Sequence, residues 1–354
     1  MKMTVFFRVQ AGPQTGLGHL WRSLSLAQAL ERHGVSSHFL LHPDPRGKEL
    51  VDRVGFRAEL WGGTDPFGEE DARETLGLAK AKAATAVVVD YHDIPVSYIQ
   101  RLRRGGLFTA VRDDLALRAL PADLVINGNA DAQGLGYERW GGGTQFLVGP
   151  RYAMLSKEYE DPAPRVISRQ VRRILVVLGG GDSQGWMSPL LDRLDRVPGD
   201  FELSAMLGPF FQGGDEIRET AGRLKRRVRL ITAQDSLTPW IAQADAAVSA
   251  AGQTLYELAA LGCPTVAVQA ADNQSGQMRA LERAGTLRGA GRAGEPGWLD
   301  RVERELTELI REASLREEMA RAGQKLVDGA GADRVARGLL ETIGAPLTLK
   351  GMQE

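Results

Sequence analysis

One histidine near the start of the chain stands where a general base could act. His19 directly follows Gly18 and lies three residues after Gly16. The apolar residues before this loop are typical of a strand, and Leu and Ala at spacings of three and four after it are typical of a helix. Glycines allow a ligand to approach the backbone closely, and a helix N-terminus lowers the proton affinity of an imidazole. We therefore expect a neutral His19 that can take a proton, with a capping or packing role as the alternative.

A second glycine loop occurs in the other half of the chain. Gly180, Gly181 and Asp182 follow the apolar run 173–178 and precede a helical pattern. Glycines ahead of a helix N-terminus are typical of a phosphate site. The loop lacks both the Gly-Lys-Ser/Thr of a P-loop and the complete Gly-x-Gly-x-x-Gly of a dinucleotide site. The hypothesis is a phosphate-binding loop, and a plain tight turn is the alternative.

A loop of small residues precedes another helical pattern. Ala251 and Gly252 would let a diphosphate reach backbone amides, and Thr254 can cap the helix or donate to phosphate. Glu257 falls one turn into that helix. Its carboxylate can accept both hydroxyls of a ribose, although dipole complementarity alone would also explain a first-turn Glu.

Two adjacent side-chain amides follow the apolar run 265–268. Asn273 and Gln274 offer donors and acceptors suited to sugar hydroxyl or acetamido groups. Amides in loops are also ordinary turn formers, so both interpretations stay open.

An alternation of apolar runs and amphipathic segments must position these loops. The expected strands cover 5–9, 37–41, 85–90, 108–112, 124–127, 145–148, 173–178, 202–207, 228–231, 246–249 and 265–268. This spacing predicts an α/β protein with mainly parallel sheets and helices on both faces. In such sheets ligands bind beyond the carboxyl ends of the strands.

The length of 354 residues favours two domains. The polar segment Asp161–Pro164 is the expected linker, which gives domains 1–160 and 161–354. From Leu299 onward the pattern is almost entirely helical, and the last helix is a candidate to cross back over the first domain.

The charge balance and the cysteine count exclude several classes of partner. Lys and Arg total 44 against 45 Asp and Glu, a net charge of -1, which argues against nucleic acid or an anionic membrane as a partner. No apolar run approaches the about 20 residues of a membrane span, and the N-terminus lacks a signal-peptide pattern, so we expect a cytoplasmic protein. Cys263 is the single cysteine, and His33, His38 and His42 have no metal-ligand spacing. We expect neither a metal site nor a cofactor, and the sequence sets no oligomeric state.

Short blocks in order along residues 5 to 275 resemble one family. They are Phe7-Arg8, Gly16-x-Gly18-His19-x-x-Arg22, Val89-Asp90, Asp113-Asp114, Leu147-x-Gly149-Pro150-x-Tyr152, Leu178-Gly179-Gly180-x-Asp182, Ala251-Gly252-x-Thr254-x-Tyr256-Glu257 and Asn273-Gln274. The chain resembles the UDP-sugar hydrolases of the pseudaminic acid pathway, which cleave UDP-2,4-diacetamido-2,4,6-trideoxy-β-L-altropyranose. That family is similar in fold to the GT-B glycosyltransferases.

The resemblance implies a GT-B-like pair of Rossmann-like domains facing a cleft, with UDP held mainly by the second. It implies that His19 activates a water and that C–O cleavage expels UDP. The substrate-binding residues that it implies are Arg8, Gly16, Gly18, Arg22, Asp90, Asp114, Gly180, Gly181, Asp182, Ala251, Gly252, Thr254, Glu257, Asn273 and Gln274.

Two positions depart from the family pattern. Gln10 stands where the family has Asp in Arg-x-Asp, and His92 stands where it has Tyr in Asp-x-Tyr. Two alternatives to hydrolysis therefore stay open. One is a GT-B glycosyltransferase, in which an acceptor hydroxyl replaces water. The other is a non-catalytic nucleotide-sugar-binding protein of surface-glycan machinery.

Overall fold

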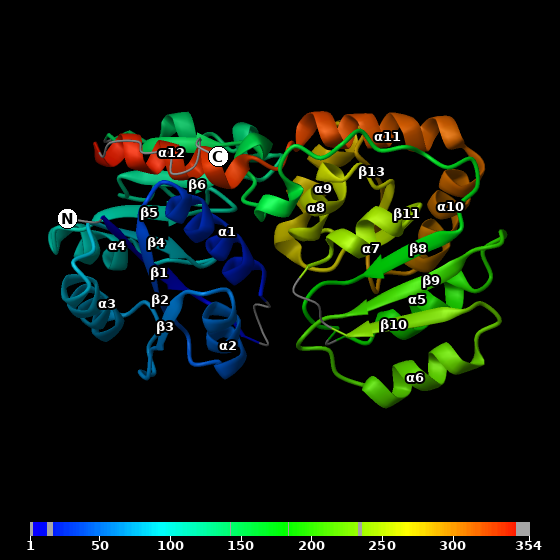
Figure 1. Cartoon of the computed structure of the whole chain (residues 1–354), viewed down its shortest axis with the longest axis horizontal. Helices are drawn as coiled ribbons and strands as arrows, with labels where there is room; N and C mark the ends of the chain where they lie inside the picture. The colour runs from blue at the N-terminus through cyan, green and yellow to red at the C-terminus, as the bar shows by residue number, and fades with distance from the viewer. Residues whose placement is uncertain (1–2, 13–16, 142, 183, 233–235, 345–354) are drawn as a thin grey trace, which may run out of the picture. The chain divides into compact units, whose positions relative to one another are not determined.

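The chain forms two compact α/β units. The computed structural model describes residues 3–12, 17–141, 143–182, 184–232 and 236–344 (Figure 1). One unit comprises Met1–Lys157 together with Gly329–Glu354, and the other comprises Glu158–Asp328. The expectation of mainly parallel sheets in each half is confirmed. No described helix combines the length and the apolar composition needed to cross a membrane.

The first unit is built on a seven-stranded parallel sheet in the order β3-β2-β1-β4-β5-β6-β7. Its strands are β1 (Thr4–Val9), β2 (Ser36–Leu41), β3 (Arg57–Leu60), β4 (Ala86–Asp90), β5 (Phe108–Arg112), β6 (Leu124–Asn127) and β7 (Gln145–Val148). Its helices are α1 (Gly18–Arg32), α2 (Pro45–Arg53), α3 (Glu69–Ala81), α4 (Val96–Arg104) and α12 (Gly331–Ile343). The strand order reverses between β1 and β4, which is where open parallel sheets form their ligand crevice.

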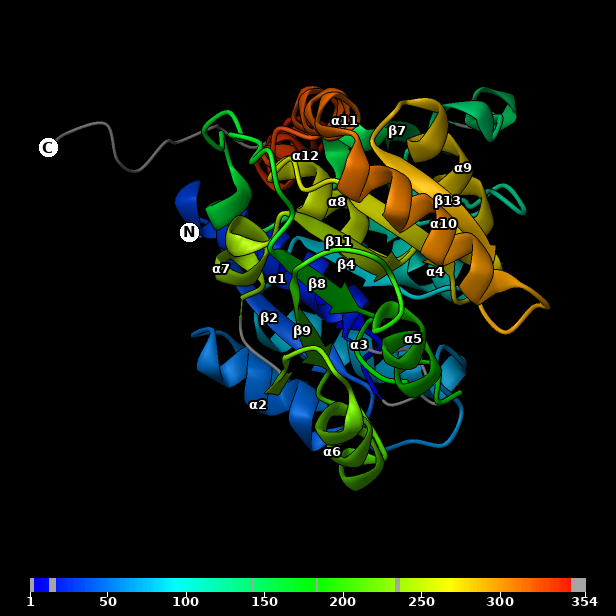
Figure 2. The same cartoon turned by 90° about the vertical axis from the view of Figure 1, so that its right-hand side faces the viewer.

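The second unit repeats this plan with six strands in the order β10-β9-β8-β11-β12-β13. The strands are β8 (Arg173–Val177), β9 (Glu202–Leu207), β10 (Val228–Thr232), β11 (Ala246–Ala250), β12 (Thr265–Gln269) and β13 (Leu287–Arg292). The helices are α5 (Met187–Leu194), α6 (Gly214–Arg223), α7 (Thr238–Gln243), α8 (Thr254–Ala260), α9 (Ser275–Arg283), α10 (Trp298–Arg311) and α11 (Ala313–Leu326). Helix α10 packs on β12 and β13 (Figure 2). Here the order reverses between β8 and β11.

Short 3-10 turns complete the two units. They cover Ala132–Gly134, Tyr137–Arg139, Pro150–Tyr152, Lys157–Tyr159 and Asp272–Gln274.

Two edge strands were missing from the sequence expectation. Strand β3 is only four residues long and is partly exposed, so it carries little apolar pattern. Strand β13 contains Gly289 and Gly291, and glycines in a strand interior argue against the assignment. Its pairing with β12 shifts register between Ala267 and Gln269.

The last helix, α12, packs in the first unit against α1, β6 and β7 (Figure 1). A Cβ atom on Gly331 would lie 2.1 Å from the Ala153 carbonyl oxygen, so only glycine permits this approach. His33 at the end of α1 bonds Asp333 of α12 at 3.0 Å. The units divide after Lys157 and after Asp328, whereas the expected second domain covered 161–354.

Arg8 on β1 lies in the core of the first unit, although the resemblance implied that it binds substrate. Its side chain is 0% exposed, and it donates to Asp71 of α3 from Nε at 3.0 Å and from Nη2 at 2.5 Å. Asp71 also accepts from the Phe67 amide at 2.9 Å and the Tyr98 hydroxyl at 2.8 Å. Burial alone would raise the pKa of Asp71, but the bonds and charge of Arg8 lower it. Arg8 therefore ties α3 to the sheet, and its guanidinium is held inside the core.

Replacing the carboxylate of this buried pair should destabilise the first unit. In Asp71→Asn the Arg8 charge stays buried without a counter-ion, and we expect the free energy of unfolding to fall by about 3–5 kcal/mol. Urea denaturation measures this loss. In the wild type, the lowered pKa of Asp71 stabilises the folded protein to its full extent above pH 3.8, the pKa of this group in the unfolded chain. The stabilisation is lost as the pH falls below that value.

The matched control is Asp52→Asn, which removes the exposed partner of Lys48, 2.6 Å away. An exposed pair contributes about 0–1 kcal/mol. Equal losses in the two variants would contradict the role assigned to Arg8 and Asp71.

Candidate functional site

The first candidate site is a polar cluster at the switch point of the first sheet. His19 is the second residue of α1, and Arg22 follows one turn later on the same face. Asp90 is the last residue of β4, and Asp114 lies two residues after β5 ends. The structure therefore brings together four residues from three separate blocks of the sequence.

The buried carboxylate of Asp90 is the centre of this cluster. Its Oδ1 lies 2.7 Å from His19 Nδ1, and Arg22 donates from Nε to Oδ2 at 2.6 Å and from Nη2 to Oδ1. Ser23 of the same helix donates to Oδ2 at 3.4 Å. Burial would raise the pKa of Asp90, but Arg22 and His19 hold it well below its usual range. Asp90 is therefore a carboxylate, and it orients the His19 imidazole.

Gln10 follows the end of β1, and the carboxylate that contacts His19 comes from the end of β4. Because β1 and β4 are neighbours in the sheet, the end of either strand can reach the start of α1.

His92 touches His19, a contact that the sequence analysis missed. The two Nε2 atoms are 3.0 Å apart, and the rings meet edge to face with centroids 4.3 Å apart. The side chain of His19 is 5% exposed, whereas that of His92 is 36% exposed. The sequence signal for His92 was its position two residues after Asp90, the aspartate that ends β4. No neighbouring residue in the sequence indicated that it contacts His19.

Asp114 anchors the other side of the cluster. It pairs with Arg112 Nη1 at 2.6 Å and accepts from Asn129 Nδ2 at 3.0 Å and from Arg22 at 3.3 Å. Burial would raise its pKa, but Arg112 and Arg22 hold it well below its usual range. Arg112 and Asn129 were also missed, although both lie at or just beyond strand ends, where site residues collect.

Two glycines complete the predicted residues of the first unit. Gly18 is the first residue of α1, and a Cβ atom there would meet nothing within 4 Å. Gly16 lies outside the described residues.

In the second unit, the β8–α5 loop places Gly180 and Gly181 just beyond the sheet. Gly208 packs so closely on this loop that a Cβ atom would lie 2.4 Å from the Gly180 carbonyl oxygen. Asp182 accepts from the amides of Trp186 at 2.9 Å and Met187 at 2.7 Å. Its carboxylate thus has a structural role at the start of α5, and the Gly180 carbonyl oxygen accepts from the Phe210 amide at 2.8 Å.

The β11–α8 loop and the turn after β12 lie side by side. A Cβ atom on Gly252 would lie 3.7 Å from Gln274 Nε2. Gln274 also accepts from the Ala270 amide at 2.8 Å. Gln277 donates to the Ala251 carbonyl oxygen at 2.6 Å. Two loops that were predicted independently thus form one surface.

Thr254 and Asn273 are the other two predicted residues of these loops. Thr254 is the first residue of α8 rather than its cap, which is Gln253. Asn273 lies in the 3-10 turn Asp272–Gln274 and is partly exposed.

Glu257 is the unusual group of the second unit. Its Oε2 is enclosed and has no hydrogen-bond partner among the described residues. Burial raises its pKa to about 7, and the nearby charge of Glu158 adds to this. A buried acceptor without a partner costs free energy, so Glu257 is poised to bind a donor such as a hydroxyl group.

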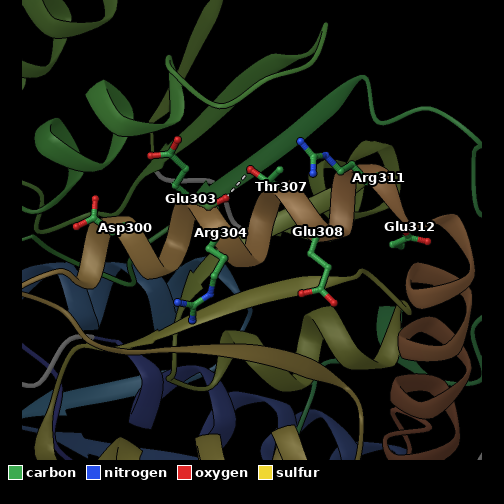
Figure 3. Close-up of a pocket in the computed structure, with 7 residues that line it drawn as sticks. All are labelled: Asp300, Glu303, Arg304, Thr307, Glu308, Arg311 and Glu312. Atoms are coloured by element: carbon green, nitrogen blue, oxygen red, sulfur yellow. Dashed lines mark hydrogen bonds between the residues drawn. The ribbon is translucent and has the colours of Figure 1, made fainter.

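A hollow of about 580 Å³ along α10 holds none of the predicted site residues (Figure 3). Its lining is almost entirely charged, and the side chains extend to opposite sides of the helix instead of converging. We interpret it as a solvated helix face. Within the described ranges, no group of three or more His, Cys, Asp or Glu side chains is arranged to hold a metal ion.

Two curated proteins are similar to the chain in sequence, and no protein-family model matches it. The uncharacterized protein MJ1062 of Methanocaldococcus jannaschii is 23% identical over 263 residues, 72% of this chain and 53% of that protein. The chain thus spans about half the length of this relative. The spore coat polysaccharide biosynthesis protein SpsG of Bacillus subtilis is 26% identical over 341 residues, 94% of this chain and 96% of that protein.

Several solved structures share the fold of this chain. Acinetobacter baumannii MurG matches with a TM-score of 0.69 and 14% identity, covering 96% of this chain and 100% of that one. MnaA of S. aureus, solved with UDP, matches with a TM-score of 0.69 and 13% identity over 100% of both chains. The spinosyn forosaminyltransferase SpnP matches with a TM-score of 0.69 and 16% identity over 97% and 100%. The GT-B fold predicted from the sequence is confirmed, and the chain is related to SpsG over nearly its whole length.

Proposed function

We propose that the chain is a hydrolase that releases UDP from a UDP-activated deoxy-diacetamido sugar of the kind handled by the pseudaminic acid family. The observation that carries this proposal is the buried Asp90 carboxylate bonded to His19 at the switch point of the first sheet. A histidine oriented by a buried carboxylate can accept a proton from an oxygen nucleophile, because the carboxylate stabilises the imidazolium that forms. The relationship to SpsG supports a role in making a polysaccharide.

In this proposal, water attacks the anomeric carbon and its proton ends on His19. The C–O bond to the diphosphate breaks, and UDP leaves with the bonding electron pair. Glu257 accepts the ribose hydroxyls, and the backbone at Gly180 and Gly181 lies against the phosphates. The unpartnered Oε2 of Glu257 supports the ribose assignment, and the position of the two glycines between the end of β8 and α5 supports the phosphate assignment.

Glycosyl transfer is the second candidate, and the fold match to transferases such as SpnP favours it. The same base would then deprotonate an acceptor hydroxyl instead of water. The two reactions differ only in the nucleophile, so the test must vary the nucleophile.

A panel of UDP-sugars, followed for UDP release without an acceptor, separates the candidates. We expect release from a diacetamido sugar and a fall in kcat of about 10²- to 10⁴-fold in His19→Gln, since the variant has lost its base. His38→Gln on β2 is the matched control and should keep wild-type activity. UDP release that begins only after an acceptor is added would mean that the enzyme transfers the sugar to the acceptor and does not hydrolyse the UDP-sugar. Binding without turnover in both conditions would mean a non-catalytic binding protein.

Calorimetry with UDP and 2′-deoxy-UDP tests the ribose assignment. Glu257→Gln should weaken UDP binding about 10- to 100-fold, because hydrogen bonds to a charged group contribute about 1.5–3 kcal/mol. The wild type should bind 2′-deoxy-UDP less tightly than UDP, and the variant should bind both alike. Glu318→Gln on α11 is the control. If the variant still discriminates between the two ligands, Glu257 does not bind the ribose.

The UDP affinity measured in these titrations should depend on pH. Because the pKa of Glu257 in the free protein is about 7 and the ribose hydroxyls favour its carboxylate, UDP affinity should rise between pH 6 and pH 8. Glu257→Gln should lack this part of the rise, and the difference between the two proteins removes the titration of the phosphate itself. Parallel curves would contradict the assignment.

A further inference from the structure

We propose that His92 is the imidazole that meets the attacking oxygen, and that it passes the proton to His19 beside Asp90. This inference rests on the proposed function, in which an oxygen nucleophile must lose a proton. It assigns a catalytic role to a residue at which the chain departs from the family pattern. His19 then becomes the group on which the proton comes to rest.

The surroundings of His19 leave it no nitrogen for a substrate. Its Nδ1 is 2.7 Å from Asp90 Oδ1 and 2.8 Å from Arg22 Nη2. Its Nε2 faces His92 Nε2 at 3.0 Å. With only 5% of the side chain exposed, an oxygen could reach Nε2 only by displacing His92.

The hydrogen-bond geometry assigns the protons in the resting state. Asp90 is ionised, and a carboxylate oxygen 2.7 Å from an unprotonated nitrogen would set two lone pairs against each other. We place the hydrogen on His19 Nδ1, because the two hydrogens of Arg22 Nη2, 2.8 Å away, have acceptors in Asp90 Oδ1 and Asp114 Oδ2. His19 Nε2 then accepts, and His92 donates to it from its own Nε2.

This assignment leaves His92 Nδ1 as the free lone pair. Among the described residues no hydrogen bond reaches this atom, and Asp114 Oδ2 is 4.0 Å away. The side chain is 36% exposed, so water or a substrate oxygen can reach it. Burial of the ring, together with the charge of Arg22, lowers the pKa of His92 below its usual value. His92 is therefore neutral at physiological pH, the form that accepts a proton.

The proton transfers balance without another reactant. The O–H bond of the nucleophile breaks, and an N–H bond forms at His92 Nδ1. The N–H bond at His92 Nε2 breaks, and one forms at His19 Nε2. His92 is again neutral, and His19 is an imidazolium whose Nδ1–H bonds Asp90.

The relay explains how a weakly basic histidine can act as the base. His92 alone would hold a proton poorly, but the positive charge comes to rest on His19 next to a fixed carboxylate. The groups that face the pair are Arg22 on α1, Asp90 on β4, and Arg112 and Asp114 at the end of β5. The formal charges of these four groups cancel.

The competing explanation is that the His92 ring only packs against His19. An edge-to-face contact 4.3 Å between centroids would suit any aromatic ring. His92→Phe keeps this contact and removes both nitrogens. Tyr91→Phe is the matched control, because Tyr91 stacks on Phe67 and lies next to His92 in sequence without touching His19.

Kinetics on the UDP-sugar that the wild type cleaves provide the first test. We expect His92→Phe to lower kcat about 10²- to 10⁴-fold, with KM and UDP affinity changed less than about threefold and Tyr91→Phe unaffected. The double variant His19→Gln/His92→Phe should be no slower than the slower single variant, since both act in one proton path. Near wild-type kcat in His92→Phe, or losses that multiply in the double variant, would overturn the relay.

Nitrogen-15 NMR of histidine-labelled protein provides a second test that needs no turnover. The expected spectrum has the hydrogen on Nδ1 of His19 and on Nε2 of His92, with His92 Nδ1 unprotonated; His92→Phe and His19→Gln assign the signals. The opposite tautomer at His92 would overturn the relay even in an active enzyme. If the wild type cleaves no UDP-sugar but shows the expected tautomers, the proposed hydrolysis fails and the His92–His19 arrangement stands.

Discussion

The polar cluster of the first unit depends on one buried carboxylate. Asp90 has no exposed surface, and burying a charge is unfavourable unless opposite charges and hydrogen bonds surround it. Arg22 and His19 meet that requirement because they lie three residues apart on α1 and face the end of β4. A shift of α1 by a single residue would turn both side chains away by about 100°. The residue at which α1 starts, the position of β4 next to β1 and the ionisation of Asp90 therefore depend on one another.

The two units treat the polar groups at their strand ends differently. In the first, Asp90 and Asp114 already have charged partners, so the cluster is organised before any ligand arrives. Such fixed groups stabilise developing charge without having to reorganise. In the second, Asp182 and Gln274 are bonded to backbone amides, while Glu257 keeps an enclosed oxygen with no partner among the described residues.

Sequence patterns located most of the candidate residues but not the partners that they contact. His19 and Asp90 could be placed at element ends because apolar periodicity and glycine loops mark those ends. Arg8 also lies on a predicted strand, yet its role depends on Asp71, which is 63 residues away. His92 was noted only as a departure from a motif, because its contact with His19 spans 73 residues. A local pattern contains no information about such partners.

The sequence by itself determined the α/β class, the parallel sheets and the loops that carry polar residues. These features follow from short-range periodicity, which any window of the chain displays. Only the tertiary structure decided which carboxylate bonds His19, which histidine touches it, and that α12 packs on α1. Those outcomes depend on the order of strands in a sheet and on contacts between distant segments. Because β4 lies next to β1 in the sheet, Asp90 and His92 at the end of β4 become neighbours of His19 near the N-terminus.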